Sequence, residues 1–183
     1  MFKYFSEINL DEIHIEALNY DNHYLIKGFS CGNINFDEFL HEDAIYEHRV
    51  VTYLIVYQNN LLGFFAISAS GINKIEEGIN YNLSAIEINY FALENKYHHI
   101  SFNEEEEKKK TKFYLSDVIF SKILNFISNN IINIVGAEFI VLYSVPEAVD
   151  LYTRNEFKNF EEYMNCSNKP YLRECIPMYI KSK

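Results

Sequence analysis

The sequence predicts a single α/β domain built on a mixed sheet, and three features of its 183 residues indicate this fold class. Two apolar segments rich in β-branched residues are separated by a short polar turn, which predicts an antiparallel hairpin. Further along, an apolar strand, a long amphipathic helix and a second apolar strand follow one another, which predicts a crossover between parallel strands. Neither a repeat nor a linker interrupts this order, so the expected domain spans residues 1–183.

The first half of the chain is predicted to form a helix and then the hairpin. The helix is expected over Phe36–His48, because its apolar residues recur at helical spacing, with Asn35 as N-cap. The hairpin strands are expected over Val51–Tyr57 and Leu61–Ser70, joined by a short polar turn. The glycines and asparagines of residues 71–82 predict a loop after the hairpin.

The middle of the chain is predicted to supply the crossover. Ile86–Leu93 reads as a strand whose second half is apolar on both faces, which is typical of a central strand. Four glutamates followed by three lysines bury nothing, so a charged loop is expected at about residues 96–112. The long helix is expected to begin at Leu115, with Ser116 as its cap, and to end near Asn129.

The last third of the chain is predicted to add two strands and a short helix. Glu138–Tyr143 is expected to be a buried strand. Ser144 and Glu147 stand at the spacing of a capping box, which predicts that the helix carrying Tyr152 begins there. Tyr171–Ile180 reads as the closing strand.

Composition sets the class of protein that is expected. The 16 Lys and Arg against 26 Asp and Glu give a formal charge of −10, which argues against a nucleic-acid-binding protein, because phosphate contacts need a basic face. Cys31, Cys166 and Cys175 form no CxxC pair, so free thiols in a reducing compartment are expected. The first residues hold no signal-peptide core, and polar residues interrupt the longest apolar region. We therefore expect a cytoplasmic protein that is not embedded in a membrane.

The histidines do not predict a metal site. His41 and Glu42 begin like the HExxH motif of zinc hydrolases, but Ile45 stands where the second histidine ligand is required. His98 and His99 lie beside the run of glutamates, where a solvated loop is the simpler interpretation. No metal ligand is therefore assigned.

Three stretches, in this order and spacing, resemble the GNAT superfamily of acyl-CoA-dependent N-acyltransferases. Ile86–His98 is similar to the central strand of the family and its following turn, and Glu147–Phe157 is similar to its short helix with a tyrosine. The flanks, Gly28–Ala44 and Cys175–Ile180, resemble the branch that includes the acetyltransferase toxins of bacterial toxin–antitoxin pairs. The resemblance implies an N-acetyltransferase that moves an acetyl group from acetyl-CoA to a primary amine by direct attack in a ternary complex.

The resemblance also implies two catalytic residues. Tyr152 matches the tyrosine that donates a proton to the departing CoA sulfur, a role consistent with phenol and thiol pKa values of about 10 and about 8.5. Taken without the family, Tyr152 is more simply interpreted as a packing residue between helix and sheet. Glu87 is the carboxylate on the central strand that matches the general base of some relatives. A surface acid at Glu87, with an amine that enters already neutral, is the alternative.

The same resemblance assigns the residues that bind acetyl-CoA. The backbone of Phe91, Ala92 and Leu93 is expected to pair with the pantetheine arm, and the start of the long helix with the pyrophosphate. The residues expected near the phosphates are Lys112, Tyr114, Leu115, Ser116 and Asp117.

Two departures from the family pattern affect this site. Tyr114 and Ser116 stand at the two glycine positions of the phosphate loop, and Asp117 adds a negative charge. The Gly-Phe pair of the family is replaced by Glu156-Phe157, so Asn155 is expected to supply the left-handed residue that ends the helix.

The acceptor and the partners stay open at this stage. An acidic protein suits a cationic acceptor, either a small-molecule amine or a lysine of a protein. An oligomer or an antitoxin-like partner protein is compatible with the resemblance. The alternative from another class is a non-catalytic GNAT-fold binding module with a degenerate phosphate loop, which the replaced glycines favour and Tyr152 opposes.

Overall fold

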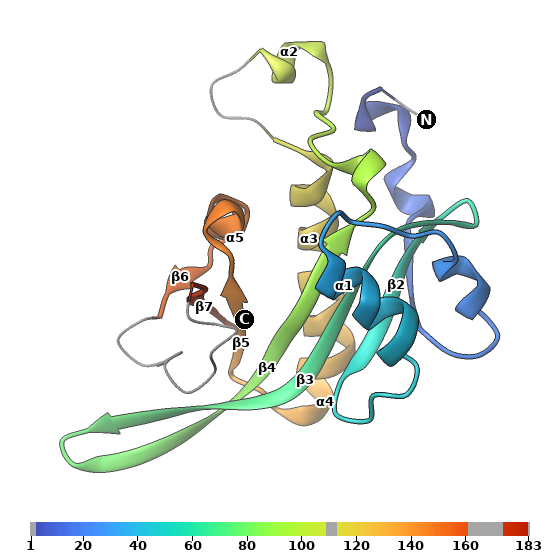
Figure 1. Cartoon of the computed structure of the whole chain (residues 1–183). Coiled ribbons are helices and arrows are strands. Elements are labelled where there is room, and N and C mark those ends of the chain that lie inside the picture. Colours follow the sequence, from blue (N-terminus) through green and yellow to red (C-terminus); the bar gives the residue numbers. More distant parts are fainter. Residues whose placement is uncertain (1–2, 109–112, 161–173, 183) are drawn as a thin grey trace. The chain divides into compact units, whose positions relative to one another are not determined.

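A computed structural model describes residues 3–108, 113–160 and 174–182 of the chain (Figure 1). Contacts divide the chain into two compact units. The first unit consists of Met1–Ile67 and Tyr90–Ile119, and the second of Ser68–Asn89 and Phe120–Lys183. Both β3 and β4 contribute residues to each unit.

Seven strands form one sheet in the order β1-β2-β3-β4-β5-β7-β6. Every pairing for which a register is defined is antiparallel except that of β4 with β5, which is parallel over Ala85–Ile88 and Phe139–Leu142. The long helix α3 connects these two strands. The predicted mixed α/β sheet with a parallel crossover is thereby confirmed. The strands are β1 His14–Ala17, β2 Val51–Tyr57, β3 Asn60–Glu76, β4 Ile79–Leu93, β5 Phe139–Ser144, β6 Lys158–Asn159 and β7 Ile176–Lys181.

The predicted hairpin between β2 and β3 is confirmed, but the loop predicted over residues 71–82 is wrong. Gln58 and Asn59 have φ of 48° and 60°, the left-handed conformation that a two-residue hairpin turn requires. A second such turn, with Glu77 at 51° and Gly78 at 82°, joins β3 to β4. Figure 1 shows these two strands running side by side to that turn. Backbone pairing supports this ribbon although most of its side chains near the turn are exposed.

The first unit contains a short helix whose bounds and N-cap differ from those predicted. Helix α1 spans Ile34–Glu38 and continues as a π-helical turn over Phe39–Asp43. The cap is Asn33, whose side chain accepts a hydrogen bond from the N–H of Asn35, so the helix starts before the predicted residue and Asn35 is not the N-cap. The buried side chains of the π turn and of Ala44, which follows it, pack with β2, β3 and the end of β4: Phe39, Leu40, Ala44, Leu54, Val56, Phe64, Ala66 and Ala92.

The crossover helix is longer than predicted. α3 spans Leu115–Ile127 and continues through a π turn, Ser128–Ile132, into α4, Asn133–Val135. Gly136, at φ 68°, ends it, instead of the asparagine that was predicted. By length and composition alone this apolar helical stretch could cross a membrane, a test that the core helix of a soluble protein also passes. Five of its side chains are fully buried within the fold: Leu115, Ile119, Phe120, Ile123 and Ile127.

The remaining helices are short. The capping box predicted at Ser144 and Glu147 is wrong, because Ser144 is the last residue of β5 and its hydroxyl donates to the carbonyl of Val145. The closing strand β7 begins at Ile176, and residues 171–173 of its predicted range lie outside the described residues. The other helices are α2 Glu104–Glu107 and α5 Val149–Arg154, with 3-10 turns at Phe5–Glu7, Leu10–Glu12, His23–Ile26, Asn95–Tyr97 and Pro146–Ala148.

Candidate functional site

Tyr152 lies on α5 in the second unit, enclosed by aromatic side chains. Its side chain is 9% exposed, and its ring meets that of Phe120 edge to face, with centroids 5.0 Å apart and an interplanar angle of 71°. The ring of Phe157 completes the cluster at 6.0 Å. Burial raises the pKa of Tyr152 far above its ordinary value of 10.0, because the phenolate would lose its hydration. The hydroxyl therefore keeps its proton throughout the neutral range.

The end of α5 fixes the direction of Tyr152. The N–H of Phe157 donates to the carbonyl of Tyr152 at 3.0 Å, and the N–H of Glu156 donates to the carbonyl of Thr153 at 3.1 Å, the two bonds of a Schellman motif. Glu156 has φ 68°, whereas Asn155 has φ −94°. The prediction that Asn155 supplies the left-handed residue is wrong, because Glu156 itself adopts this conformation.

No described residue forms a hydrogen bond with the Tyr152 hydroxyl. The fully buried side-chain polar atoms that lack a partner among the described residues are Thr52 Oγ1 and Asn89 Oδ1, and the Tyr152 hydroxyl is not one of them. The hydroxyl oxygen therefore keeps some access to the surface, where it can donate to a bound molecule. The sequence alone predicts a tyrosine on this helix. It does not predict that aromatic rings surround Tyr152 or that its hydroxyl has no hydrogen-bond partner among the described residues.

Glu87 lies on β4 in the second unit, beside Val141 of β5 in the parallel register. Ile86 and Ile88 are buried, and Glu87 is only partly buried on the other face of the strand, as strand alternation predicts. Its carboxylate accepts hydrogen bonds from the Ser70 hydroxyl at 3.1 Å and from the Asn89 amide at 3.3 Å. These two neighbours were not predicted from the sequence, although Asn89 stands two residues from Glu87 on the same strand face.

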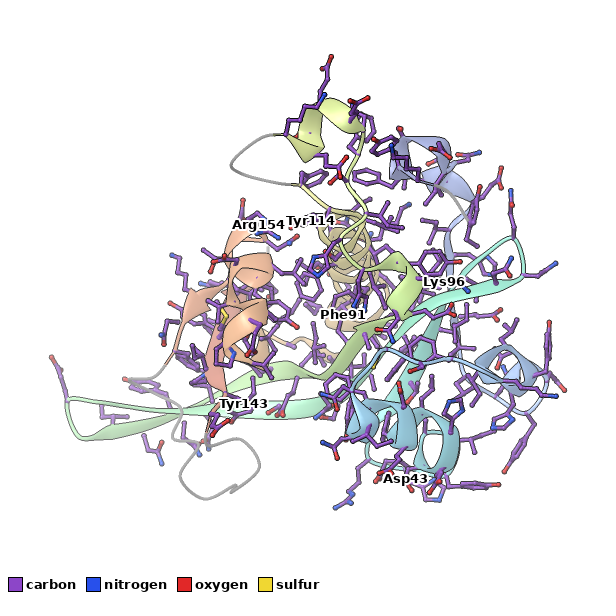
Figure 2. The ribbon with its side chains drawn as sticks, turned by 45° about the horizontal axis from the view of Figure 1, so that its top comes forward. Asp43, Phe91, Lys96, Tyr114, Tyr143 and Arg154 are labelled. Carbon is purple, nitrogen blue, oxygen red and sulfur yellow. The ribbon has the colours of Figure 1, made fainter. Side chains whose placement is uncertain are left out.

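The candidate pantetheine segment, residues 91–93, lies in the part of β4 that belongs to the first unit (Phe91 is labelled in Figure 2). The N–H of Glu94 donates to the carbonyl of Leu62 on β3 at 2.9 Å. Backbone groups alternate in direction along a strand, so Ala92 also faces β3, while Phe91 and Leu93 face the opposite edge. On that edge the carbonyl of Leu93 bonds to Nε2 of His98 at 2.9 Å. The carbonyl of Leu93 is therefore already used as a hydrogen-bond acceptor on this edge of β4.

The start of α3 in the first unit differs from an open phosphate loop. The N–H of Tyr114 donates to Oδ2 of Asp117 at 2.8 Å, the N–H of Leu115 to the carbonyl of Ile100 at 2.8 Å, and the N–H of Asp117 to the carbonyl of Tyr114 at 3.0 Å. Asp117 is 2% exposed. Its carboxylate therefore caps the helix from the inside, and the predicted cap, Ser116, lies within the helix. Lys112 lies outside the described residues.

The two positions where the family has glycine do not adopt a left-handed backbone. Tyr114 and Ser116 are absent from the described non-glycine residues with positive φ. Tyr114 instead forms an isolated antiparallel bridge with Ser101, and its ring packs edge to face on that of His99 at 5.6 Å (Figure 2 labels Tyr114). The steric difficulty that a tyrosine would meet at positive φ does not arise in this backbone.

The described candidate residues are divided between the two units. Glu87 and Tyr152 belong to the second unit. The described cofactor candidates all belong to the first: Phe91, Ala92, Leu93, Tyr114, Leu115, Ser116 and Asp117. Asp117 was predicted to lie near the phosphates and to add a negative charge there, and its role as a cap was not predicted. Its spacing of three residues from the residue before the helix is the spacing of a capping box, and this signal in the sequence could have identified its role.

The described residues contain no group of three or more His, Cys, Asp or Glu that could hold a metal ion. His41, which begins the incomplete HExxH pattern, forms a hydrogen bond through Nε2 to the carbonyl of Phe29 at 2.9 Å. Its ring is thus engaged in fixing the loop before α1.

Comparison with known proteins identifies similar folds. No family model matches the chain, and no curated protein matches its sequence. A crystal structure of AtaTR bound with acetyl-CoA is similar at a TM-score of 0.69 and 14% identity, over 94% of this chain and 95% of that one. A tyrosine-to-phenylalanine mutant of KacT gives 0.66 and 16%, over 93% and 95%. The KacTA–DNA complex gives 0.63 and 16%, over 93% of each chain. At these identities the comparison establishes the GNAT fold.

Proposed function

We propose that this chain is an N-acetyltransferase that moves an acetyl group from acetyl-CoA to a primary amine. The observation that carries the proposal is Tyr152, a buried and protonated phenol on a helix that ends in a Schellman motif and follows the parallel crossover. The raised pKa makes this phenol a weaker acid than a free tyrosine, so its transfer of a proton to a leaving thiolate depends on close positioning. Two features of similar structures support this assignment. Acetyl-CoA is bound in some of them, and a tyrosine was replaced by phenylalanine in others.

The proposed reaction needs no covalent enzyme intermediate. Glu87 takes one proton from the acceptor ammonium, and the neutral amine nitrogen attacks the thioester carbonyl. As the carbon–sulfur bond breaks, Tyr152 protonates the sulfur, and the proton that the new amide nitrogen loses returns to the phenolate, directly or through water. The net products are the acetamide, CoA thiol and one proton on Glu87. General acid and base steps of this kind each contribute about 10²–10⁴-fold in rate.

The residues of the first unit fit part of a CoA-binding role. The N–H of Leu93 and the backbone of Phe91 point to the edge of β4 away from β3, where an extended pantetheine arm can pair with them. The family resemblance assigns the stabilisation of the oxyanion to strand amides of this segment, and we propose the N–H of Leu93 for that role. The amides at the start of α3 fit the pyrophosphate less well, because Asp117 already accepts the N–H of Tyr114. We therefore propose that Lys112 and Ser116 supply more of the phosphate contacts than these amides.

A toxin-type enzyme with an antitoxin-like partner is the narrower form of this proposal. Two similar structures are of the AtaT toxin bound to the C-terminus of the antitoxin AtaR, and they align over nearly the whole of both chains. The formal charge of −10 favours a protein partner or a cationic acceptor over nucleic acid. Inducible expression in bacteria tests this form: growth arrest by the wild type, but not by Tyr152→Phe, would support it.

Calorimetric titration with acetyl-CoA tests the enzyme proposal. A ligand at 100 times its dissociation constant adds about 2.7 kcal/mol of stability, a melting shift of about 5–10 °C at this size. We expect wild type and Tyr152→Phe to bind equally, and thiol release with an amine panel to fall about 10²–10⁴-fold in the variant. Exposed Tyr24→Phe is the matched control and should leave both unchanged.

Two results would contradict the enzyme proposal in different ways. If acetyl-CoA does not bind, it is not the cosubstrate, and the proposed reaction is wrong. Binding without amine-dependent thiol release, and without any effect of Tyr152→Phe, would favour the non-catalytic binding module, for which the occupied amides at the start of α3 are the supporting observation.

A further inference from the structure

The imidazole of His98 lies at the edge of β4 that faces away from β3. The trans peptide between Leu93 and Glu94 directs the N–H of Glu94 to β3, and it therefore directs the carbonyl of Leu93 to the opposite edge. Nε2 of His98 lies 2.9 Å from this carbonyl oxygen. Because a carbonyl has no proton to give, Nε2 carries the hydrogen and donates it.

This contact places the His98 ring in the position of a neighbouring strand. A group that hydrogen-bonds to an outward carbonyl of a strand lies beside that strand, about where the backbone of the next strand would run. In the described part of the chain, Ile88 is the last residue of β4 with a defined partner on β5. A carbonyl oxygen can accept a second hydrogen bond, but the ring itself fills the space that an extended chain paired with Leu93 needs.

The His98 side chain is held between a fixed turn and a residue of uncommon conformation. The 3-10 turn Asn95–Tyr97 follows β4, and the buried side chain of Tyr97 fixes it within the first unit. His98 and His99 are exposed, and His99 has φ 55°, which is uncommon for a residue with a Cβ. Rotation about the side-chain bonds of His98 is therefore enough to move its ring from the edge of β4 into solvent.

Three rings extend from the edge of β4 to the start of α3 within the first unit. The rings of His98 and His99 meet at 84° with centroids 6.2 Å apart, and those of His99 and Tyr114 meet at 76° and 5.6 Å. Tyr114 directly precedes α3 (Figure 2 labels it together with Phe91 of β4). A pantetheine arm that pairs with Leu93 and leads to phosphates near α3 has to pass this row of rings.

We propose that His98 is a gate of the acetyl-CoA site. In the chain without ligand its imidazole closes the edge of β4, and acetyl-CoA binds to the form in which this ring has turned away from the Leu93 carbonyl. This inference rests on the proposed acetyl transfer and concerns the regulation of that same site. The measured affinity is the intrinsic affinity of the open form multiplied by its fraction. One net hydrogen bond holds the gate closed, which reduces the affinity about two- to tenfold.

Calorimetric titration of the full chain with acetyl-CoA tests the gate. His98→Ala removes the ring and should raise the affinity about two- to tenfold over wild type. His98→Gln keeps an N–H donor on a side chain of similar reach, so its affinity should stay near that of wild type. His99→Asn is the matched control, because it removes the neighbouring ring, tolerates a positive φ and keeps the contact of His98 with Leu93. Thermal unfolding without ligand checks that each variant folds.

Nuclear magnetic resonance of the histidine rings gives a readout that does not depend on affinity. In the free wild type, His98 should show the Nε2-protonated tautomer that the Leu93 carbonyl selects, in a signal that is assigned by its loss in His98→Ala. Saturation with acetyl-CoA should change this signal, because the ring then faces solvent. An unchanged signal in the saturated complex would mean that the ring stays on Leu93, and the gate would be wrong.

The outcomes separate the gate from the proposed function. If acetyl-CoA binds neither wild type nor His98→Ala, the acetyl-transfer proposal fails, and the gate fails with it. Binding by His98→Ala alone would support both. If His98→Ala binds acetyl-CoA with the affinity of wild type or more weakly, the gate is wrong while acetyl transfer stands. An equal gain in His99→Asn would also contradict the gate, since that variant keeps the contact with Leu93.

Discussion

The ring of Phe120 meets the ring of Tyr152 edge to face at 5.0 Å, and this contact holds the phenol through its apolar body. Tyr152→Phe keeps the ring, so we expect its unfolding free energy to stay within about 1 kcal/mol of wild type. Tyr152→Ala should lower it by about 3–5 kcal/mol, because it leaves a cavity beside Phe120 and Phe157. Urea denaturation of the two variants measures both values. If Tyr152→Phe and Tyr152→Ala lost the same unfolding free energy, the hydroxyl would have a hydrogen-bond partner that stabilises the fold.

The long ribbon of β3 and β4 shows where prediction from the sequence reaches its limit. The hairpin and the crossover were predictable because their side chains alternate or recur with the period of a buried face. The segment around Gly71 and Asn82 lacks such a pattern, since its side chains are mostly exposed, and it reads as a loop. Its strand structure depends on backbone pairing between two exposed segments, which leaves no hydrophobic signal.

The candidate site was predictable as single residues but not as an arrangement. Tyr152 and Glu87 follow from the family resemblance, whereas the contacts of Glu87 with Ser70 join residues 17 positions apart through strand register. The use of Asp117 as an internal cap depends on its side chain turning back to Tyr114. A sequence fixes which groups are available, while register and side-chain direction decide which of them meet.

The left-handed backbone at Glu156 predicts a stabilising substitution. A side chain at φ 68° costs about 1–2 kcal/mol, and glycine avoids this cost while losing about 0.5–1 kcal/mol of chain entropy. Glu156→Gly should therefore raise the unfolding free energy by about 0.5–1 kcal/mol, and Glu156→Asn by less.

The matched control for this substitution is Asn155→Gly, one residue earlier. Its φ of −94° carries no strain of this kind, so the change should destabilise the protein. Urea midpoints of the three variants give the order directly. A gain from Asn155→Gly, or none from Glu156→Gly, would contradict the strain that we assign to Glu156.

The internal cap at Asp117 predicts a variant with tighter binding of acetyl-CoA. Asp117→Asn keeps an oxygen for the Tyr114 N–H but removes a negative charge from the start of α3. If the phosphates approach this end, the affinity should rise about two- to fivefold at low salt, the usual strength of a charge at a helix terminus, and the gain should shrink in high salt. Calorimetry at two salt concentrations measures it. Exposed Asp150→Asn changes the net charge equally and serves as control; an equal gain there would show that net charge alone is responsible.

Cys31 predicts a loss of stability at alkaline pH. Burial, reinforced by the neighbouring Asp37 carboxylate, raises the pKa of its thiol from 9.0 to about 11, and the side chain is 8% exposed. Between these values the unfolded chain loses the proton while the folded chain keeps it. The contribution of the protonated thiol is therefore fully present below pH 9 and is lost as the pH rises toward 11, by at most about 1.4 kcal/mol per pH unit.

The difference between wild type and Cys31→Ser isolates this effect from the ionisation of the many tyrosines, which both proteins share. Urea denaturation at pH 8, 9 and 10 should show the two stability curves approaching each other as the pH rises, because serine does not ionise in this range. A constant difference across the three pH values would mean that the thiol titrates alike in the folded and unfolded chains. In that case burial among Phe29, Phe39 and Leu40 would not keep the thiolate from forming.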